Sequence, residues 1–330
     1  MFHRPVRPTP RSRLLTWWAT VGAVSALTLG LPAESVAADT PRPPVGAGSS
    51  APAAFVRGTL QPEAPPAGAN DWTCRPTAAH PRPVVLLHAT YTNAHMNWSM
   101  LSPRLKRAGY CVFAPNYGGE PGVPLKATRH VPDSAREVAR YVDRVLDATG
   151  ARQVDLVGHS QGGGVLPRWY LRFEGGTDPA KPARNKVRRL IGLAPSNHGT
   201  TVAGLGTLTT ELGLDRPVSL LAGQAYADQM VGSAVNTTLD RGGDTQPGVT
   251  YTVIATRYDE VVTPYHHQFL TAGPGAKVRN ITLQDVCPQD RSEHISIAYD
   301  SNALQLVLNA LDPAHPKPLR CGFSAPLIGG

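Results

Sequence analysis

The sequence contains little cysteine, and the arrangement of its cysteines and histidines excludes the common metal sites. Four cysteines occur in 330 residues, none of them in a C-x-x-C pair, and the histidines show no ligand spacing. We therefore expect no metal; the alternative is a structural calcium ion bound by scattered Asp residues. A glycine-rich phosphate loop after a first strand is also missing, which argues against a nucleotide site. The sequence predicts a protein that needs no cofactor.

Charge is limited as well. Charged residues make up 17% of the chain and hydrophobic residues 41%, which is typical of a globular protein with a sizeable core. The net charge is +8, of which residues 1–37 contribute +3 and leave +5 for the rest. The remaining basic residues are scattered along the sequence, so we expect no nucleic-acid partner.

Long apolar runs are absent except at the N-terminus. Four arginines come first, residues 14–31 carry no charge, and small residues follow at 35–38. This order predicts a secretory signal peptide, residues 1–38, that is cleaved after Ala37 or Ala38. The alternative is an uncleaved membrane anchor, because the apolar run is long for a signal peptide. No second run is long enough to span a bilayer, so we expect a secreted, extracellular protein.

Export favours disulfides over free thiols. The four cysteines allow three pairings. We favour the two local pairs, Cys74 with Cys111 and Cys287 with Cys321, because either alternative would tie the beginning of the chain to its end. The remaining possibility is four buried free thiols.

The rest of the chain divides into a flexible segment and one domain. Residues 39–70 are rich in Pro, Ala and Gly and predict a flexible segment. In residues 71–330 short apolar runs alternate with helix-length segments, without internal repeats. This alternation predicts an α/β fold, with a mostly parallel central sheet and helices on both faces. The expected strands are 84–87, 111–114, 154–157, 187–194, 250–255 and 281–283, and the expected helices are 100–108, 133–149 (capped by Asp133 or Ser134), 165–173 and 302–311.

One region interrupts the alternation. Residues 199–248 contain no strong strand and carry glycine-rich joints between weakly amphipathic pieces. The region follows a strand at the carboxyl end of the sheet, where α/β proteins place their sites. We interpret it as a helical cap or lid insertion over the site. The alternative is an ordinary helical insertion that covers core.

The central motif is Gly-x-Ser-x-Gly at residues 158–162. A β-prone run precedes it and a helix-length segment follows, which is the strand–turn–helix context of a nucleophile elbow. Ser160 is then the candidate nucleophile on a strained turn, and Gly158 and Gly162 let strand and helix approach closely. The alternative is a surface turn that happens to contain a serine.

A serine nucleophile needs a base and an orienting carboxylate, which in this context follow it in the order acid, then histidine. Asp259, in the loop after the expected strand 250–255, is the candidate acid. Glu260 and Asp285 are rivals, and a surface ion pair between Asp259 and Arg257 is the non-catalytic alternative.

His294 is the candidate base, because it lies in a polar loop before the last expected helix. His315 lies in a proline-rich exit segment that is hard to place in a site. His266 and His267 are expected to face the cap or the surface.

An oxyanion needs two backbone N–H donors. Gln161 follows the nucleophile and supplies one. Thr90, in the turn after the first strand, supplies the other, and its hydroxyl could add a third. Tyr91 is the fallback. The alternative is that Thr90 and Tyr91 are simply strand-end residues.

Four separated motifs, at 158–163 with 167–170, 193–200, 256–265, and 293–294 with 298–300, resemble the secreted bacterial lipase class 2 family of α/β-hydrolases. The resemblance covers about residues 71–321. It implies the α/β-hydrolase fold, a triad of Ser160, Asp259 and His294, and hydrolysis of acylglycerols or simpler carboxylic esters outside the cell.

One motif departs from that family. The family has His-Gly-Thr after the first strand, whereas this chain has His88, Ala89 and Thr90. Alanine takes a positive φ less readily than glycine. We therefore expect the oxyanion turn to differ from that of the family.

The sequence thus predicts a secreted serine ester hydrolase, a lipase or esterase, that acts as a monomer on an ester or lipid substrate, including one at a lipid–water interface. An acyltransferase that passes the acyl group to an alcohol or sugar would use the same triad. A catalytically idle binding or cell-surface protein on this fold is the third possibility, and an intact triad in chain order argues against it.

Overall fold

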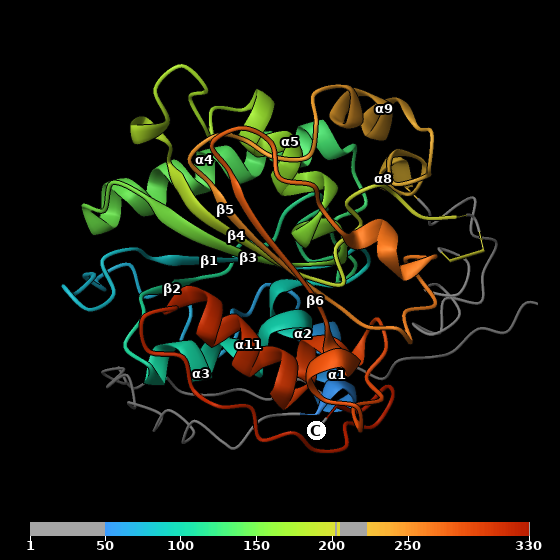
Figure 1. Ribbon diagram of the computed structural model, residues 1–330. Helices are drawn as coiled ribbons and strands as arrows, with labels where there is room; N and C mark the ends of the chain where they lie inside the picture. Colours follow the sequence, from blue (N-terminus) through green and yellow to red (C-terminus); the bar gives the residue numbers. More distant parts are fainter. Residues whose placement is uncertain (1–49, 202, 205–222, 330) are drawn as a thin grey trace, which may run out of the picture. The chain divides into compact units, whose positions relative to one another are not determined.

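A six-stranded parallel sheet forms the centre of the computed structural model, which describes residues 50–201, 203–204 and 223–329 (Figure 1). The expected signal peptide lies outside the described residues, as do 39–49 of the expected flexible segment and 202 and 205–222 of the expected cap. The strand order is β2-β1-β3-β4-β5-β6, and every pair is parallel. The strands are β1 Val84–Leu87, β2 Val112–Phe113, β3 Val154–His159, β4 Val187–Leu193, β5 Thr250–Ala255 and β6 Lys277–Thr282.

The strand order reverses direction between β1 and β3, at the carboxyl ends of the strands. The chain places β2 on one side of β1 and β3 on the other, so the loops after β1 and β3 leave the carboxyl edge in opposite directions. In open parallel sheets, ligands bind in the crevice that such a reversal opens. The turn with Thr90 follows β1, and Ser160 follows β3.

Helices cover both faces of the sheet, as expected (Figure 1). Helices α4 and α5 pack on one face, where they share a core with alternate residues of β1, β2 and β3. Helices α2, α3 and α11 pack on the other face with the intervening strand residues. The described helices are α1 Ala51–Leu60, α2 Ala94–Trp98, α3 Leu101–Arg107, α4 Val131–Thr149, α5 Val165–Phe173, α8 Gly223–Asp228, α9 Ala234–Arg241, α10 Leu283–Val286 and α11 Ser301–Leu311, with single 3₁₀ turns at η1 Ser160–Gly163, η2 Pro182–Arg184, η3 Tyr265–Gln268 and η4 Ser296–Tyr299.

Helix α4 begins earlier than predicted, so the expected caps are wrong. The N-cap residue is His130, which makes no side-chain capping bond, and Pro132 lies in the first turn. Proline suits that position because its missing N–H would have no partner there. Asp133 falls within the first turn, where its negative charge favours the helix dipole. Gly150 ends the helix with a φ of 68°, as glycine commonly does.

Helix α1 lies in the segment that was expected to be flexible. Ala51 and Ala54 are buried against Ala298 and Tyr299, and the Ala51 N–H donates to the carbonyl of Ile328 over 3.3 Å. The prediction of a flexible segment is therefore wrong for residues 51–60. The alanines that gave the segment its low complexity are good helix formers and are small enough to pack closely.

Both disulfides join residues that are near in sequence. Cys74 pairs with Cys111 and Cys287 with Cys321, which is the pairing expected from the sequence, with separations of 37 and 34 residues. Among the described residues, every helix is too short or too polar to be a candidate for crossing a bilayer.

Candidate active site

Ser160 occupies a strained turn between β3 and α5. Its φ is 53°, a left-handed value that costs a non-glycine residue about 1–3 kcal/mol. A Cβ at Gly158 would overlap the carbonyl of Gly162, and one at Gly162 would overlap the carbonyls of Leu87 and His88. The two glycines are therefore required by the close approach of strand and turn, which is the backbone form of a nucleophile elbow.

His294 lies between Ser160 and Asp259. Its Nε2 is 3.0 Å from Oγ of Ser160, and its Nδ1 is 2.9 Å from Oδ2 of Asp259. All three residues are buried, with exposed fractions of 0% for His294, 3% for Ser160 and 6% for Asp259. The structure thus brings together the three residues that the sequence singled out, on the loops after β3, β5 and β6.

The carboxylate of Asp259 accepts four hydrogen bonds. Oδ1 accepts from the backbone N–H groups of Val261 and Val262, at 3.0 and 2.7 Å. Oδ2 accepts from Gln268 Nε2 at 2.8 Å and faces His294. Every lone pair of the carboxylate has a partner, so its orientation toward the imidazole is fixed. Gln268 was not identified from the sequence, since nothing in its neighbourhood distinguishes it from a surface glutamine.

Opposing effects set the pKa of His294. Burial lowers it, but the charge of Asp259 and the hydrogen bond between the two residues raise it further than burial lowers it. Glu293 and Glu260 add to the rise. The pKa of His294 therefore lies above the ordinary histidine value of 6.5.

The rival residues lie elsewhere. Asp285 pairs with Arg257 at an exposed position, so the ion pair considered for Asp259 forms with Asp285 instead. His315 is exposed and contacts Asp312. His266 is exposed in η3. Among these alternatives, none has the contacts that His294 and Asp259 share.

Thr90 and Gln161 meet beside the candidate nucleophile. Gln161 is the second residue of η1, where the first N–H groups of a helix have no partner within it. The hydroxyl oxygen of Thr90 accepts from Gln161 Nε2 at 3.0 Å and from Gln229 Nε2 at 2.9 Å. With both lone pairs engaged, the hydroxyl proton is available to another acceptor. Gln229, just after α8, was not foreseen as a neighbour of this turn.

The turn after β1 accommodates Ala89 without strain. Ala89 is not among the residues with positive φ, whereas Tyr91 has a φ of 60°. The left-handed position thus lies two residues after Ala89, and the alanine carries no conformational cost of that kind.

Asn97 and His159 connect the three loops of the site. Asn97 Oδ1 accepts from the N–H of Ala89 at 2.9 Å and lies 3.0 Å from His159 Nδ1. His159 Nε2 is 2.7 Å from the carbonyl of His294. These contacts link the turn after β1, the elbow and the histidine loop. Burial lowers the pKa of His159 to about 3. Neither residue was predicted from the sequence, because the contact between them spans 62 residues and the contact of His159 with His294 spans 135.

Glu293 holds the histidine loop from the other side. Its carboxylate accepts from the N–H of Ile295 at 2.6 Å and of Ser296 at 3.0 Å. It also accepts from the N–H of Leu327 at 2.8 Å. The end of the chain therefore contacts the residue next to the candidate base.

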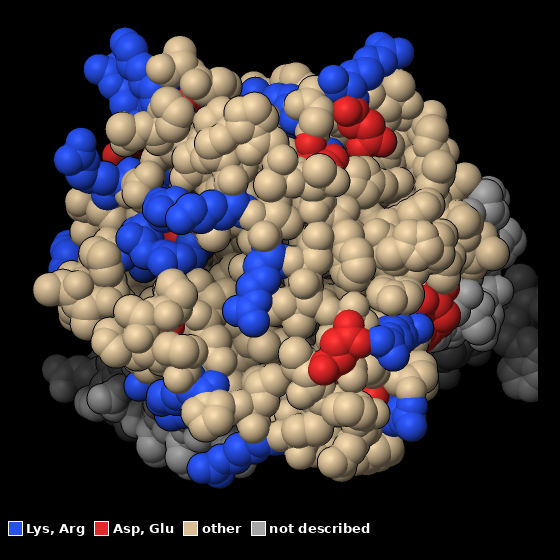
Figure 2. Space-filling view, in the orientation of Figure 1, with Lys and Arg blue, Asp and Glu red and all other residues tan. Residues whose placement is uncertain are grey.

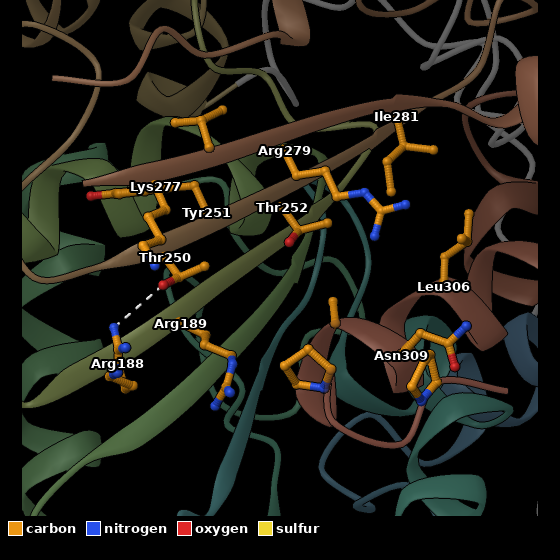
Figure 3. Close-up of a pocket in the computed structure, with 14 residues that line it drawn as sticks. Arg188, Arg189, Thr250, Tyr251, Thr252, Lys277, Arg279, Ile281, Leu306 and Asn309 are labelled. Carbon is orange, nitrogen blue, oxygen red and sulfur yellow. Dashed lines mark hydrogen bonds between the residues drawn. The ribbon is translucent and has the colours of Figure 1, made fainter.

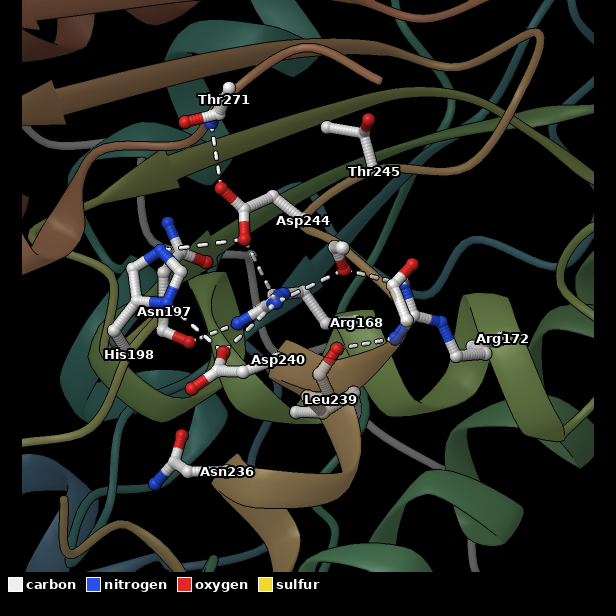
Figure 4. Close-up of polar contacts among 12 residues, drawn as sticks. Arg168, Arg172, Asn197, His198, Asn236, Leu239, Asp240, Asp244, Thr245 and Thr271 are labelled. Carbon is white, nitrogen blue, oxygen red and sulfur yellow. Dashed lines mark hydrogen bonds and ion pairs between the residues drawn. The ribbon is translucent and has the colours of Figure 1, made fainter. Parts of the chain in front are cut away.

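A polar cluster surrounds the buried side chain of Arg168 (Figure 4). Arg168, from α5, lies 3.5 Å from Asp240 and 3.4 Å from Asp244. It also donates to the carbonyl of Asn197, whose side chain donates to the carbonyl of Gln268 at 2.5 Å. The cluster is thus linked to the residue that orients the candidate acid.

The same cluster offers three possible metal ligands. Side-chain atoms of His198, Asp240 and Asp244 lie within 4.8 Å of one another, and Figure 4 shows them around Arg168. The guanidinium already supplies positive charge to both carboxylates. A hydrogen bond from the His198 ring to the carboxylate of Asp244 raises the pKa of His198, which favours a further cation rather than a ligand. The donor set therefore fits an ion-pair network better than a metal site.

Helix α1 reaches the candidate site through Phe55. Phe55 lines a small cavity, of about 10 Å³, together with Thr90, His159, His294 and Ile295. It also packs on a buried apolar cluster beside the site, which is made up of Tyr91, Val261 and Ile295 with Leu125, Tyr226 and Met230 at its margin.

Comparisons with known proteins agree with this architecture. Residues 82–217 match the family described as alpha/beta hydrolase fold. Lipase B of Aspergillus fumigatus is similar in structure, with a TM-score of 0.57 and 21% identity; the alignment covers 79% of this chain and 57% of that lipase. Mature lipase BlEst2 of Bacillus licheniformis aligns with a TM-score of 0.49 and 16% identity over 76% of this chain and 96% of that protein.

At these identities the likeness concerns the fold. The chain spans 57% of the length of the Aspergillus lipase, so that enzyme's activity is not transferred by the alignment. The matched region contains β1, β3 and the elbow serine. With its six parallel strands, two helical layers and strand–turn–helix elbow, the chain has the α/β-hydrolase fold.

Proposed function

We propose that this protein is a secreted serine hydrolase of carboxylic esters, with Ser160 as nucleophile, His294 as base and Asp259 as orienting acid. The observation that carries the proposal is the pair of hydrogen-bonding distances from His294, 3.0 Å to Ser160 and 2.9 Å to Asp259. Serine is a weak nucleophile near neutral pH and needs such a base within reach. The similarity in fold to lipase B of Aspergillus fumigatus is consistent with ester hydrolysis.

In the proposed reaction, Nε2 of His294 takes the Ser160 proton as Oγ attacks the ester carbonyl. The oxyanion is held by the N–H groups of Gln161 and Thr90 and by the Thr90 hydroxyl. His294 then protonates the leaving alcohol, and an acyl-enzyme forms. Water, activated by the same imidazole, attacks the acyl-enzyme, releases the acid and returns the proton to Ser160.

The apolar surroundings favour an acyl substrate. The buried cluster of Tyr91, Val261 and Ile295 adjoins the site, and Phe55 packs against it. An acyl chain gains about 0.8 kcal/mol for each CH₂ group that it buries. We therefore propose acylglycerols or simpler apolar esters as substrates, in line with the resemblance to the lipase class 2 family.

Export and a cap complete the proposal. Residues 1–38 would act as the signal peptide, and the two disulfides suit an oxidising compartment. Residues 199–248 would form the cap. In its described part, α8 contributes Tyr226 near the apolar cluster, and Gln229 contacts Thr90.

Replacement of the nucleophile tests the proposal. Ser160→Ala should abolish hydrolysis of nitrophenyl butyrate and labelling by a fluorophosphonate probe, with the folded state retained by circular dichroism. Ser292→Ala, a buried serine of the histidine loop, serves as control and should keep labelling. Wild-type turnover in Ser160→Ala would refute the assignment.

A series of acyl lengths defines the substrate. Rates on nitrophenyl esters from two carbons to long chains, and on emulsified triglyceride, separate a lipase from an esterase. Supplying an alcohol during the assay separates hydrolysis from acyl transfer: free acid as the main product supports hydrolysis, and a new ester as the main product supports the acyltransferase.

A further inference from the structure

A basic groove lies on the sheet face that α11 covers only in part. The groove has a volume of about 590 Å³; the first halves of β4, β5 and β6 line it on one side, and the end of α11 lines it on the other (Figure 3). Parallel sheets are normally covered on both faces. Here α11 buries Ile254 and Ile281 in its core, while Lys277 and Arg279 at the start of β6 stay exposed.

The strand register sets the spacing of the cations. Arg189 on β4 pairs with Thr250 on β5, which pairs with Lys277 on β6. Arg279 pairs with Thr252, two residues further along both strands. Residues two apart share a face of a strand, so both rows lie on the same side. By strand geometry, Arg189 and Lys277 are about 10 Å apart at the backbone, and Lys277 and Arg279 about 7 Å.

The positive charge of the groove is poorly neutralised. Arg189 shares the carboxylate of Asp155 with Arg82, at 3.2 and 3.0 Å. Among the described residues, Lys277 and Arg279 have no ion-pair partner within 4.0 Å. The lining contains no carboxylate. In the orientation of Figure 1, Lys and Arg outnumber acidic residues on the side of this face where the strands begin (Figure 2).

These features identify the class of ligand. Arginine side chains present forked donors that match the oxygens of phosphate and carboxylate groups. A single compact anion could reach two neighbouring cations, such as Lys277 and Arg279, whereas a chain bearing repeated anionic groups could meet Arg189, Lys277 and Arg279 together. We propose that the groove binds a linear polyanion that carries phosphate or carboxylate groups.

The position of the groove separates this binding from catalysis. The groove lies at the amino ends of β4–β6, whereas Ser160, Asp259 and His294 follow the carboxyl ends of strands. A strand of six residues is about 20 Å long. The bound polymer would hold the protein on an anionic matrix and leave the carboxyl ends of the strands, with the candidate active site, free. The inference does not depend on the proposed function.

The test measures binding of fluorescein-labelled polyphosphate and poly-L-glutamate to the purified chain by fluorescence anisotropy at 50 mM NaCl. Lys277→Gln/Arg279→Gln should weaken binding roughly tenfold or more, and should reduce the slope of log K against log[NaCl] by about 1.4, as expected for two lost contacts. Arg140→Gln/Arg241→Gln removes the same charge from exposed helical positions away from the groove and should change both quantities little.

The outcomes divide cleanly. Preference for polyphosphate identifies a phosphate polymer, and preference for polyglutamate identifies a carboxylate polymer. Absence of binding to both polymers overturns the proposal. So does pyrophosphate binding as tight as that of the polymers, since it indicates a compact-anion site. An equal loss of polymer affinity in the two double variants would indicate general charge attraction and would also overturn the proposal.

Charged side chains on the edge strand β6 also prevent this strand from pairing with other molecules, so the double variant could aggregate. A second measurement therefore uses the unmodified protein. Acetylation of Lys277 in the unmodified protein is followed by mass spectrometry with and without the preferred polymer. Polymer should slow acetylation of Lys277 but not of Lys106, an exposed residue of α3 that does not line the groove. Equal rates with and without polymer would contradict the proposal even if the variants aggregate.

Discussion

At the scale of single residues, the hydrogen-bond partners of Asp259 and His294 determine the expected pH behaviour. Asp259 is buried, and hydrogen bonds from Val261, Val262 and Gln268 orient its carboxylate charge. That charge faces His294 and holds the pKa of the imidazole above 6.5 in spite of burial. The neutral imidazole is the form that can take a proton from serine.

Hydrolysis of a soluble ester should therefore rise with pH through a pKa above 6.5. In a Ser160→Ala background, Asp259→Asn should lower the pKa of His294, followed by NMR titration of the imidazole; in the active protein it should lower kcat by about 10³–10⁴-fold. Asp285→Asn, at the exposed rival, should change neither. An unmoved His294 pKa in Asp259→Asn would contradict the assignment.

The same pair links stability to pH. Because folding raises the pKa of His294, its contribution to stability is fully present below the unfolded value of about 6.5. The contribution is lost as pH rises through the folded pKa.

Thr90 allows a second prediction at this scale. Thr90→Val keeps the backbone N–H and the side-chain size but removes the hydroxyl, which accepts from Gln161 and Gln229. If the hydroxyl donates to the oxyanion, kcat for a short ester should fall roughly 10²-fold, with little change in KM. Thr90→Ser should restore most of the rate. Wild-type kcat in the valine variant would remove the hydroxyl from the mechanism.

At the scale of elements, the local sequence pattern predicted the central strands better than it predicted the edge strand β6 and helix α1. Strands β1 and β5 and helix α5 agree residue for residue with prediction, because each is apolar and bounded by turn residues. Strand β6 begins at Lys277 rather than 281; three of its first four residues are polar and exposed, so they form no apolar run. Helix α1 was missed because it packs against Ala298 and Tyr299 of η4, which are remote from it in sequence.

The candidate triad could be predicted because chain order and loop position restrict the choice. Its supporting residues could not. Gln268, Asn97, His159 and Gln229 each make at least one contact with a segment more than 60 residues away in sequence. No spacing rule joins these residues, and only the folded arrangement places them together.

Docking of α1 can be tested directly. Ala54 is buried against Tyr299, whereas the adjacent Ala53 is exposed. Ala54→Asp would bury a carboxylate without a designed partner and should lower the free energy of unfolding by about 2–4 kcal/mol. Ala53→Asp should cost no more than about 0.5 kcal/mol. Equal effects in urea unfolding would indicate that the helix is not docked.

At the scale of the whole molecule, the two disulfides stabilise opposite margins of the sheet. Cys111 directly precedes edge strand β2, and Cys287 follows β6, the other edge strand, after one short helix. Each bond closes a loop of similar length. The margins of the sheet are thus held to the chain segments beyond them.

Removing either bond should have a similar and additive effect. Loops of 37 and 34 residues correspond to about 4 kcal/mol each in the chain-entropy description. Cys74→Ala/Cys111→Ala and Cys287→Ala/Cys321→Ala should each lower the free energy of unfolding by about that amount in denaturant titrations. The quadruple variant should lose the sum, because the sites do not share partners; a much smaller sum would show that the two margins are coupled.

The hydrogen bond from Leu327 to Glu293 has a practical consequence for handling the protein. The chain's last residues touch the loop that carries His294. An affinity tag fused after residue 330 would therefore begin a few residues from that contact. Its length and charge would be expected to alter measured turnover, so kinetic comparisons are best made on protein whose C-terminal tag has been removed.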